Sequence, residues 1–182
     1  LTSLALVATV PGKVIDASKF ETLQAALDAV PEGGVLVKLP PGKFELTEPL
    51  RVHTEDTRLE GAGTATHLIN KNEKGEPALL LRAGDYAKSK KKLWRIQLGN
   101  LRISGNPKSG DGVQAEGINE IFVQGVSIDH NGGHGLNLVN CYEDPRISDN
   151  LLTYNGRAGL NILGGHDIVV NANQFEENQD GL

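Results

Sequence analysis

The chain has 182 residues, of which 38% are hydrophobic and only 4% aromatic, so we expect one domain with an aliphatic core. The formal net charge of −5 argues against a general nucleic-acid binder, which must neutralise phosphates. No window approaches the roughly 18 apolar residues of a membrane-spanning helix. The single cysteine, Cys141, excludes an internal disulfide framework.

The N-terminal part predicts a short helix that covers one end of the fold. Residues 4–8 are apolar and fit either the stub of a cleaved secretion signal or a first strand. Ser18 and Glu21 have the spacing of a capping box, and an apolar stripe follows until Pro31. We therefore expect a capping helix over residues 18–31, followed by strands at 35–39 and 43–46 that are separated by a Pro-Pro-Gly turn.

The second half contains an internal repeat. Asn106, Asn131, Asn155 and Asn178 are spaced 25, 24 and 23 residues apart, and each is followed by a Gly with an aliphatic neighbour. After each of the first three Gly pairs the chain alternates between apolar and polar residues, as in a strand with one buried face. This pattern predicts an all-β parallel β-helix with three strands per coil of 23–25 residues.

We assign all of residues 1–182 to this one domain, with stacked coils over residues 33–182. The sequence stops at Gly181-Leu182, the start of a fresh strand, so we expect an open C-terminal end. An uncapped coil is a candidate surface for end-to-end homo-oligomers.

Three segments of the first half resemble the opening of pectate-lyase-like right-handed parallel β-helix proteins. They are Gly33-Gly34-Val35, Leu39-Pro40-Pro41-Gly42 and Leu59-Glu60-Gly61-Ala62-Gly63, and the later Asn and Gly repeats are similar to those of the same superfamily. In that family the strands of a coil are called PB1, PB2 and PB3, and polysaccharide lies along PB1 and its flanking turns. By resemblance, the strands that start at the Gly-aliphatic pairs are PB1.

The groove along PB1 would then be lined by outward-facing polar side chains. On the strands these are Gln114, Glu116, Asn137 and Asn161, and the incoming turns add Lys108, Asp111, His130, His134, Tyr154 and Arg157. Amides, a tyrosine and an arginine along a shallow groove suit a sugar polymer, and Lys108 or Arg157 could pair with uronate carboxylates. We take Lys108, Asp111, Gln114, Glu116, Asn137 and Asn161 as substrate-binding candidates.

The chemistry favours elimination or epimerisation of uronates over hydrolysis. Glycoside hydrolysis needs two close carboxylates, and Glu116 is followed on its row by Val139 and Leu163. Elimination needs a base, an acid and a cation: His130 or His134, Tyr154, and Arg157 or Lys108 can supply them. The layout is similar to that of mannuronan epimerases, but their Asp-Pro-His-Glu is replaced here by Gln114-Ala115-Glu116-Gly117, which disfavours that particular reaction.

Three classes of function remain open. The first is a secreted or periplasmic lyase-type enzyme that acts on a uronate polysaccharide. The others are a non-catalytic carbohydrate-binding or adhesion module, and a structural or truncated β-helix. Calcium is common in pectate lyases, but the carboxylates of Asp111, Asp129 and Asp180 fall on different rows or coils, so we assign no metal or cofactor site.

Overall fold

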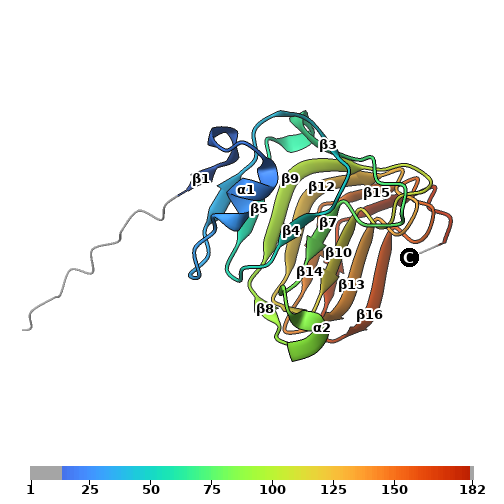
Figure 1. The fold of residues 1–182 in the computed structure, drawn as a ribbon. Coiled ribbons are helices and arrows are strands. Elements are labelled where there is room, and N and C mark those ends of the chain that lie inside the picture. The colour runs from blue at the N-terminus through green and yellow to red at the C-terminus, as the bar shows by residue number, and fades with distance from the viewer. Residues whose placement is uncertain (1–13, 181–182) are drawn as a thin grey trace, which may run out of the picture.

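The computed structural model describes residues 14–180, and those residues form a parallel β-solenoid (Figure 1). The expected signal-peptide stub at residues 4–8 and the pair Gly181-Leu182 lie outside the described residues. Every strand pairing between coils is parallel, as the repeat predicted.

One sheet of the solenoid corresponds to PB1. Its five strands, in spatial order, are β16 (Leu160–Gly165), β13 (Leu136–Cys141), β10 (Val113–Glu116), β7 (Leu79–Leu81) and β4 (Leu50–Val52). Gln114 pairs with Asn137, and Asn137 pairs with Asn161, so the predicted outward row exists in register. The residues between them on each strand, such as Val113, Ala115 and Leu138, are buried.

The remaining strands correspond to PB2 and PB3. In two coils these merge into one bent strand, β9 (Gln97–Ser104) and β12 (Phe122–Asp129). In later coils they are separate strands: β14 (Arg146–Ser148) and β15 (Leu151–Thr153), then β17 (Val169–Asn171) and β18 (Gln174–Glu176). Earlier coils supply β1 (Ile15–Asp16), β2 (Leu36–Lys38), β3 (Gly42–Leu46), β5 (Arg58–Glu60) and β6 (Thr66–Asn70). The predicted strands at 35–39 and 43–46 are thus confirmed as β2 and β3.

The N-terminal helix is shorter than predicted. Residues 18–31 hold a 3₁₀ turn, η1 (Ala17–Lys19), and one α-helix, α1 (Leu23–Asp28). The expected capping box at Ser18 is wrong, because the Ser18 amide and hydroxyl both donate to Oδ1 of Asp16, and Oγ1 of Thr22 accepts from the Ala25 amide instead. The helix does cover a strand edge: the Gln24 amide hydrogen-bonds both the N–H and the carbonyl of Arg51 in β4.

The coil length is 23–25 residues throughout the second half but varies in the first. Leu79 of β7 pairs with Val113 of β10, 34 residues further on. The excess comes from a loop that contains α2 (Tyr86–Ser89) and the two-residue strand β8 (Leu93–Trp94), which pairs with β11 (Ile118–Asn119). A second 3₁₀ turn, η2 (Gly63–Ala65), precedes β6.

The core is a column of aliphatic side chains inside the coils, as the low aromatic content predicted. Leu59, Leu98, Val123 and Ile147 follow one another on PB2, and each is at most 2% exposed. In the last coil the equivalent residue, Val170, is 41% exposed. No helix among residues 14–180 is long and apolar enough to cross a membrane.

Candidate functional site

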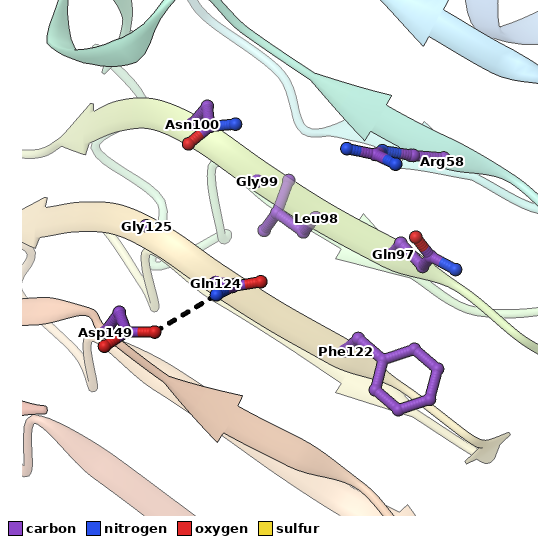
Figure 2. A pocket seen from close by; sticks show the side chains of 9 residues that line it. All are labelled: Arg58, Gln97, Leu98, Gly99, Asn100, Phe122, Gln124, Gly125 and Asp149. Atoms are coloured by element: carbon purple, nitrogen blue, oxygen red, sulfur yellow. Dashed lines mark hydrogen bonds between the residues drawn. The ribbon is translucent and has the colours of Figure 1, made fainter. Parts of the chain in front are cut away.

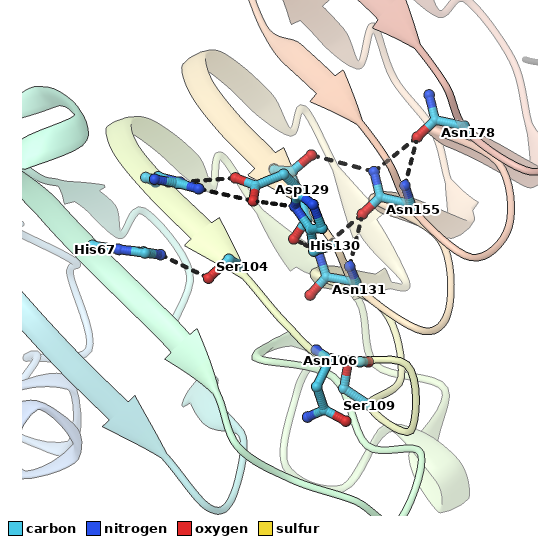
Figure 3. Close-up of polar contacts among 11 residues, drawn as sticks. His67, Ser104, Asn106, Ser109, Asp129, His130, Asn131, Asn155 and Asn178 are labelled. Carbon is cyan, nitrogen blue, oxygen red and sulfur yellow. Dashed lines mark hydrogen bonds and ion pairs between the residues drawn. The ribbon is translucent and has the colours of Figure 1, made fainter.

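A cavity of about 570 Å³ lies where PB3 runs into the turn that leads to PB1. Its walls come from the end of β9, the end of β12 and the turns that follow each coil (Figure 3). The side chains with acid, base or charge chemistry that line it are Arg102, Ser104, Asp129, His130 and Tyr154. Only His130 and Tyr154 among them were predicted as site residues.

Asp129 organises the centre of this cavity. It is 5% exposed and receives two hydrogen bonds from Arg102, Nε to Oδ2 at 2.8 Å and Nη2 to Oδ1 at 2.9 Å. Burial raises the pKa of Asp129, but the hydrogen bonds from Arg102 and His130 outweigh that effect and hold the pKa below its ordinary value. Asp129 is therefore a carboxylate near neutral pH.

That charge state sets the chemistry of His130. Nδ1 of His130 lies 2.8 Å from Oδ1 of Asp129. A carboxylate can only accept a hydrogen bond, so Nδ1 donates to it, and the neutral tautomer that fits this contact has its lone pair on Nε2. The His130 side chain is 62% exposed, which leaves Nε2 open to a ligand. An imidazole oriented in this way by a buried carboxylate is equipped to act as a general base.

Tyr154 lies one coil further along at the same repeat position. Its ring stacks on that of His130 with a centroid separation of 5.2 Å and an interplanar angle of 22°. Both residues have a left-handed backbone, with φ near 55°, and Glu177 in the next coil has φ 51°. This sharp turn after PB3 directs the two rings outward, where Tyr154 is 49% exposed.

The asparagines beside these residues hold the turns in place. Asn131, Asn155 and Asn178 form a ladder in which Oδ1 of Asn155 accepts from the backbone N–H and Nδ2 of Asn131, and Oδ1 of Asn178 accepts from the same two groups of Asn155 (Figure 3). Asn106 departs from the predicted series, because its Nδ2 bonds the carbonyls of Asn70 and Asn72 instead. The ladder explains the asparagine spacing by structure rather than by ligand binding.

Sequence reasoning missed a polar pair at the edge of the cavity, in which Ser104 lines the cavity and His67 contacts Ser104 from the neighbouring coil. Nε2 of His67 on β6 lies 2.7 Å from the hydroxyl of Ser104, which is 9% exposed. Burial, and then the Arg102 cation, lower the pKa of His67. His67, Arg102 and Ser104 sit on the outward face of PB3, in register with Ser127 and Asp129. In the sequence, the only signal for these three residues is that they occupy outward positions in the alternating pattern of their strands.

The outward face of the PB1 sheet, where the groove was predicted, carries the predicted amides but few free ionisable groups. Nδ2 of Asn161 donates to Oδ1 of Asn137, and Nδ2 of Asn137 donates to Oδ2 of Asp111. Oδ1 of Asp111 accepts from the His134 backbone N–H at 2.7 Å, so this carboxylate braces the turn. Gln114 lies half-buried on the same outward row. This face of PB1 is therefore a polar track of amides along the solenoid axis.

The two charged candidates near this groove are already paired. Oε2 of Glu116 forms an ion pair with Nη1 of Arg82 at 2.9 Å. Lys108 pairs with Glu73 at 2.8 Å, and both side chains are more than 60% exposed. Neither residue lines the His130 cavity. Glu116 and Lys108 are thus placed as surface ion pairs at the groove margin.

His134 does not face the groove, so that part of the prediction is wrong. The residue is only 6% exposed, and its Nδ1 is buried without a hydrogen-bond partner in the described chain. Burial lowers the pKa of His134; Asp111 opposes the effect, and Arg157 adds to it. Arg157 itself is exposed on the turn after Tyr154.

The structure thus separates the predicted catalytic set. His130 and Tyr154 lie together in the cavity, whereas His134 and Arg157 do not line it. Asp129, which was not among the predicted site residues, is the carboxylate that orients His130. Within residues 14–180, no cluster of three or more His, Cys, Asp or Glu side chains is placed to hold a metal ion.

The parallel register, the buried aliphatic column and the asparagine ladder define a parallel β-helix. The chain belongs to the right-handed β-helix family: the family model described as "Right handed beta helix region" matches residues 64–182. No curated protein sequence matches the chain.

Solved structures of similar fold share little sequence with it. ORF18 of Geobacillus virus E2 superposes with a TM-score of 0.79 at 18% identity, covering 93% of this chain and 38% of that protein. The A-module of the Azotobacter vinelandii mannuronan C-5 epimerase AlgE4 gives 0.63 at 20% identity, covering 86% of this chain and 46% of the module. The AlgE6 A-module gives 0.53 at 19%, covering 86% and 52%. The chain therefore spans about half or less of each neighbour, and the likeness is one of fold.

Proposed function

We propose that the chain acts on a uronate-containing polysaccharide as a lyase-type enzyme, with His130 as the base. The observation that carries the proposal is the Asp129–His130 pair beside Tyr154 in an open cavity. A polymeric substrate of this kind would place the protein in the extracellular space or the periplasm. Two of the structural neighbours are named as mannuronan epimerase modules, and mannuronan is itself a polymer of a uronic acid.

The residues of the cavity supply each part of an elimination. Nε2 of His130 takes the proton from the carbon next to the uronate carboxylate. The Tyr154 hydroxyl gives a proton to the leaving glycosidic oxygen. Nη1 of Arg102 takes no part in the pair with Asp129 and can face the substrate carboxylate, where it stabilises the carbanion. Arg102 takes the role for which Lys108 and Arg157 were predicted.

The amide track on PB1 supports binding of the rest of the polymer. Gln114, Asn137 and Asn161 follow one another with the spacing of parallel strands, about 4.8 Å per coil. A row of amides offers donors and acceptors to successive sugar hydroxyls. The second candidate function, a non-catalytic carbohydrate-binding module, rests on the same row, because these amides could bind a polymer but include no base that could cleave it.

The test is the ultraviolet absorbance of unsaturated uronate products, with a panel of uronate polymers and with or without calcium. His130→Ala should lower the initial rate by about 100-fold or more, and Tyr154→Phe should lower it as well. His166 is a matched control, since its Nδ1 lies 2.6 Å from Oδ2 of Asp167 and its ring contacts Tyr142, but it lines no part of this cavity.

Full activity in the His130→Ala protein would refute the assigned base. Retention of a polymer by the wild-type protein without any product would favour the binding module. His166→Ala should match the wild type, because an exposed His–Asp–Tyr group outside the cavity has no part in the reaction.

A further inference from the structure

A second hollow, of about 460 Å³, lies on the outer face of PB2 (Figure 2). It occupies the other end of the bent strands β9 and β12, away from the His130 cavity. In this part of the sheet Leu98 and Val123 face the core, and their neighbours face outward. Outward residues therefore decide the shape of the hollow.

Glycine creates the space. Gly99 stands on the outward row between Glu60 and Gln124, so one coil lacks a side chain there. Gly125 sits at the bend with φ 66°, where it leaves a second gap. A Cβ on Gly99 would lie 3.2 Å from the Gln124 carbonyl oxygen, and a longer side chain at this position would occupy the hollow.

The polar groups around this space are held by contacts with one another on the sheet surface. Nε2 of Gln124 donates to Oδ2 of Asp149 at 3.1 Å. Glu60 accepts from Asn100 and pairs with Arg58 at 2.9 Å, which neutralises that guanidinium. Arg146 lies over the Phe122 ring at 5.8 Å and balances the Asp149 carboxylate, so the surroundings of the hollow carry no net charge that would favour an anionic ligand. Carboxylate and amide oxygens in fixed positions instead suit the donors of neutral hydroxyl groups.

Phe122 adds an apolar surface at one side (Figure 2). Its ring is half-buried and lies in the same outward row as Arg58 and Gln97. A sugar ring combines polar hydroxyls with an apolar C–H face, and an aromatic side chain beside amides and a carboxylate matches both. We propose that this hollow is a binding site for a neutral sugar residue of a glycan chain. The proposal does not depend on the reaction at His130.

The test is a titration of the purified chain with neutral hexasaccharides, cellohexaose and mannohexaose, and with hexagalacturonate, followed by calorimetry and saturation-transfer NMR. Gly99→Gln fills the hollow, and Phe122→Ala removes the apolar surface. Gly33→Gln is the control, because nothing lies within 4 Å of a Cβ at Gly33. Circular dichroism verifies that each variant is folded.

We expect a neutral hexasaccharide to bind the wild type and the Gly33→Gln protein equally, with affinity lowered about tenfold or more by Gly99→Gln and by Phe122→Ala. The rate of uronate elimination should be the same in the Gly99→Gln protein as in the wild type, so the two proposals fail separately. The assignment is overturned if neither neutral sugar binds, if Gly99→Gln leaves their binding unchanged, or if Gly99→Gln abolishes binding of hexagalacturonate instead.

Discussion

The asparagine ladder should be the most sensitive polar element of the fold, and Asn155→Ala tests it. The Asn155 side chain makes four hydrogen bonds: Oδ1 accepts from the N–H and Nδ2 of Asn131, and Nδ2 donates to the Ile128 carbonyl and to Oδ1 of Asn178. Asn155 is 2% exposed, so water cannot replace these bonds. At about 1 kcal/mol each, their loss should lower the free energy of unfolding by about 4 kcal/mol.

Asn161→Ala is the matched control for this prediction. It removes the same atoms from an asparagine on the outer row, whose Nδ2 makes one bond, to Oδ1 of Asn137. Because Asn161 is only half-buried, water can solvate the freed group, and we expect a loss of less than about 1 kcal/mol. Urea unfolding followed by far-ultraviolet circular dichroism measures both variants. Equal losses in the two proteins would refute the argument from burial.

Three other changes follow from particular contacts. Because the pKa of Asp129 is held below its ordinary value, its ionisation stabilises the fold above the unfolded pKa of about 3.9, and this contribution is lost as the pH falls through the folded pKa. The stability of Asp129→Asn in urea unfolding should therefore fall less than that of the wild type below about pH 4. Parallel pH dependences of the two proteins would contradict this. Burial raises the pKa of the Cys141 thiol to about 11, so the native protein should not react with Ellman's reagent near neutral pH, whereas the urea-unfolded chain should react fully. Gly117 has φ 66°, and its Cβ would lie 2.1 Å from the Tyr86 ring, so Gly117→Ala should lower the melting temperature while Gly33→Ala leaves it unchanged.

The sequence was sufficient to predict the coils because one residue type repeats wherever a turn must be braced. Asn131, Asn155 and Asn178 mark the turn after PB3, and the alternation that follows them assigns the PB1 row. Asn106 has the same spacing and a different role. Nine positions separate Ser104 from Val113, against seven between the paired Asp129 and Leu136, so its turn follows another path.

The site was harder to predict, because neighbours across coils have no fixed sequence separation in the first half. His67 contacts Ser104 over 37 positions, a separation that the repeat does not predict. Arg102 reaches Asp129 over 27 positions, diagonally past its 25-residue partner Ser127, so the side-chain direction rather than the repeat brings the two together. His130 and His134 look equivalent in the sequence, yet His130 is exposed and His134 is buried. A left-handed residue at 130 turns the first ring outward, and spacing alone does not reveal that turn.

Both cavities lie beside β9, and the reason is the size of its outward residues. On the PB2 row Gly99 stands between Glu60 and Gln124, and on the PB3 row Ser104 stands between Ile69 and Asp129. Equivalent positions in a solenoid stack at about 4.8 Å, so neighbouring side chains normally fill the surface between coils. A small residue in one coil opens a hollow beside it. At Gly99 the walls come from the coils on both sides, Arg58 before it and Phe122 after it, whereas at Ser104 they come from β9 and the later coils. The position of a site on this solenoid therefore follows from where the row of large side chains is interrupted.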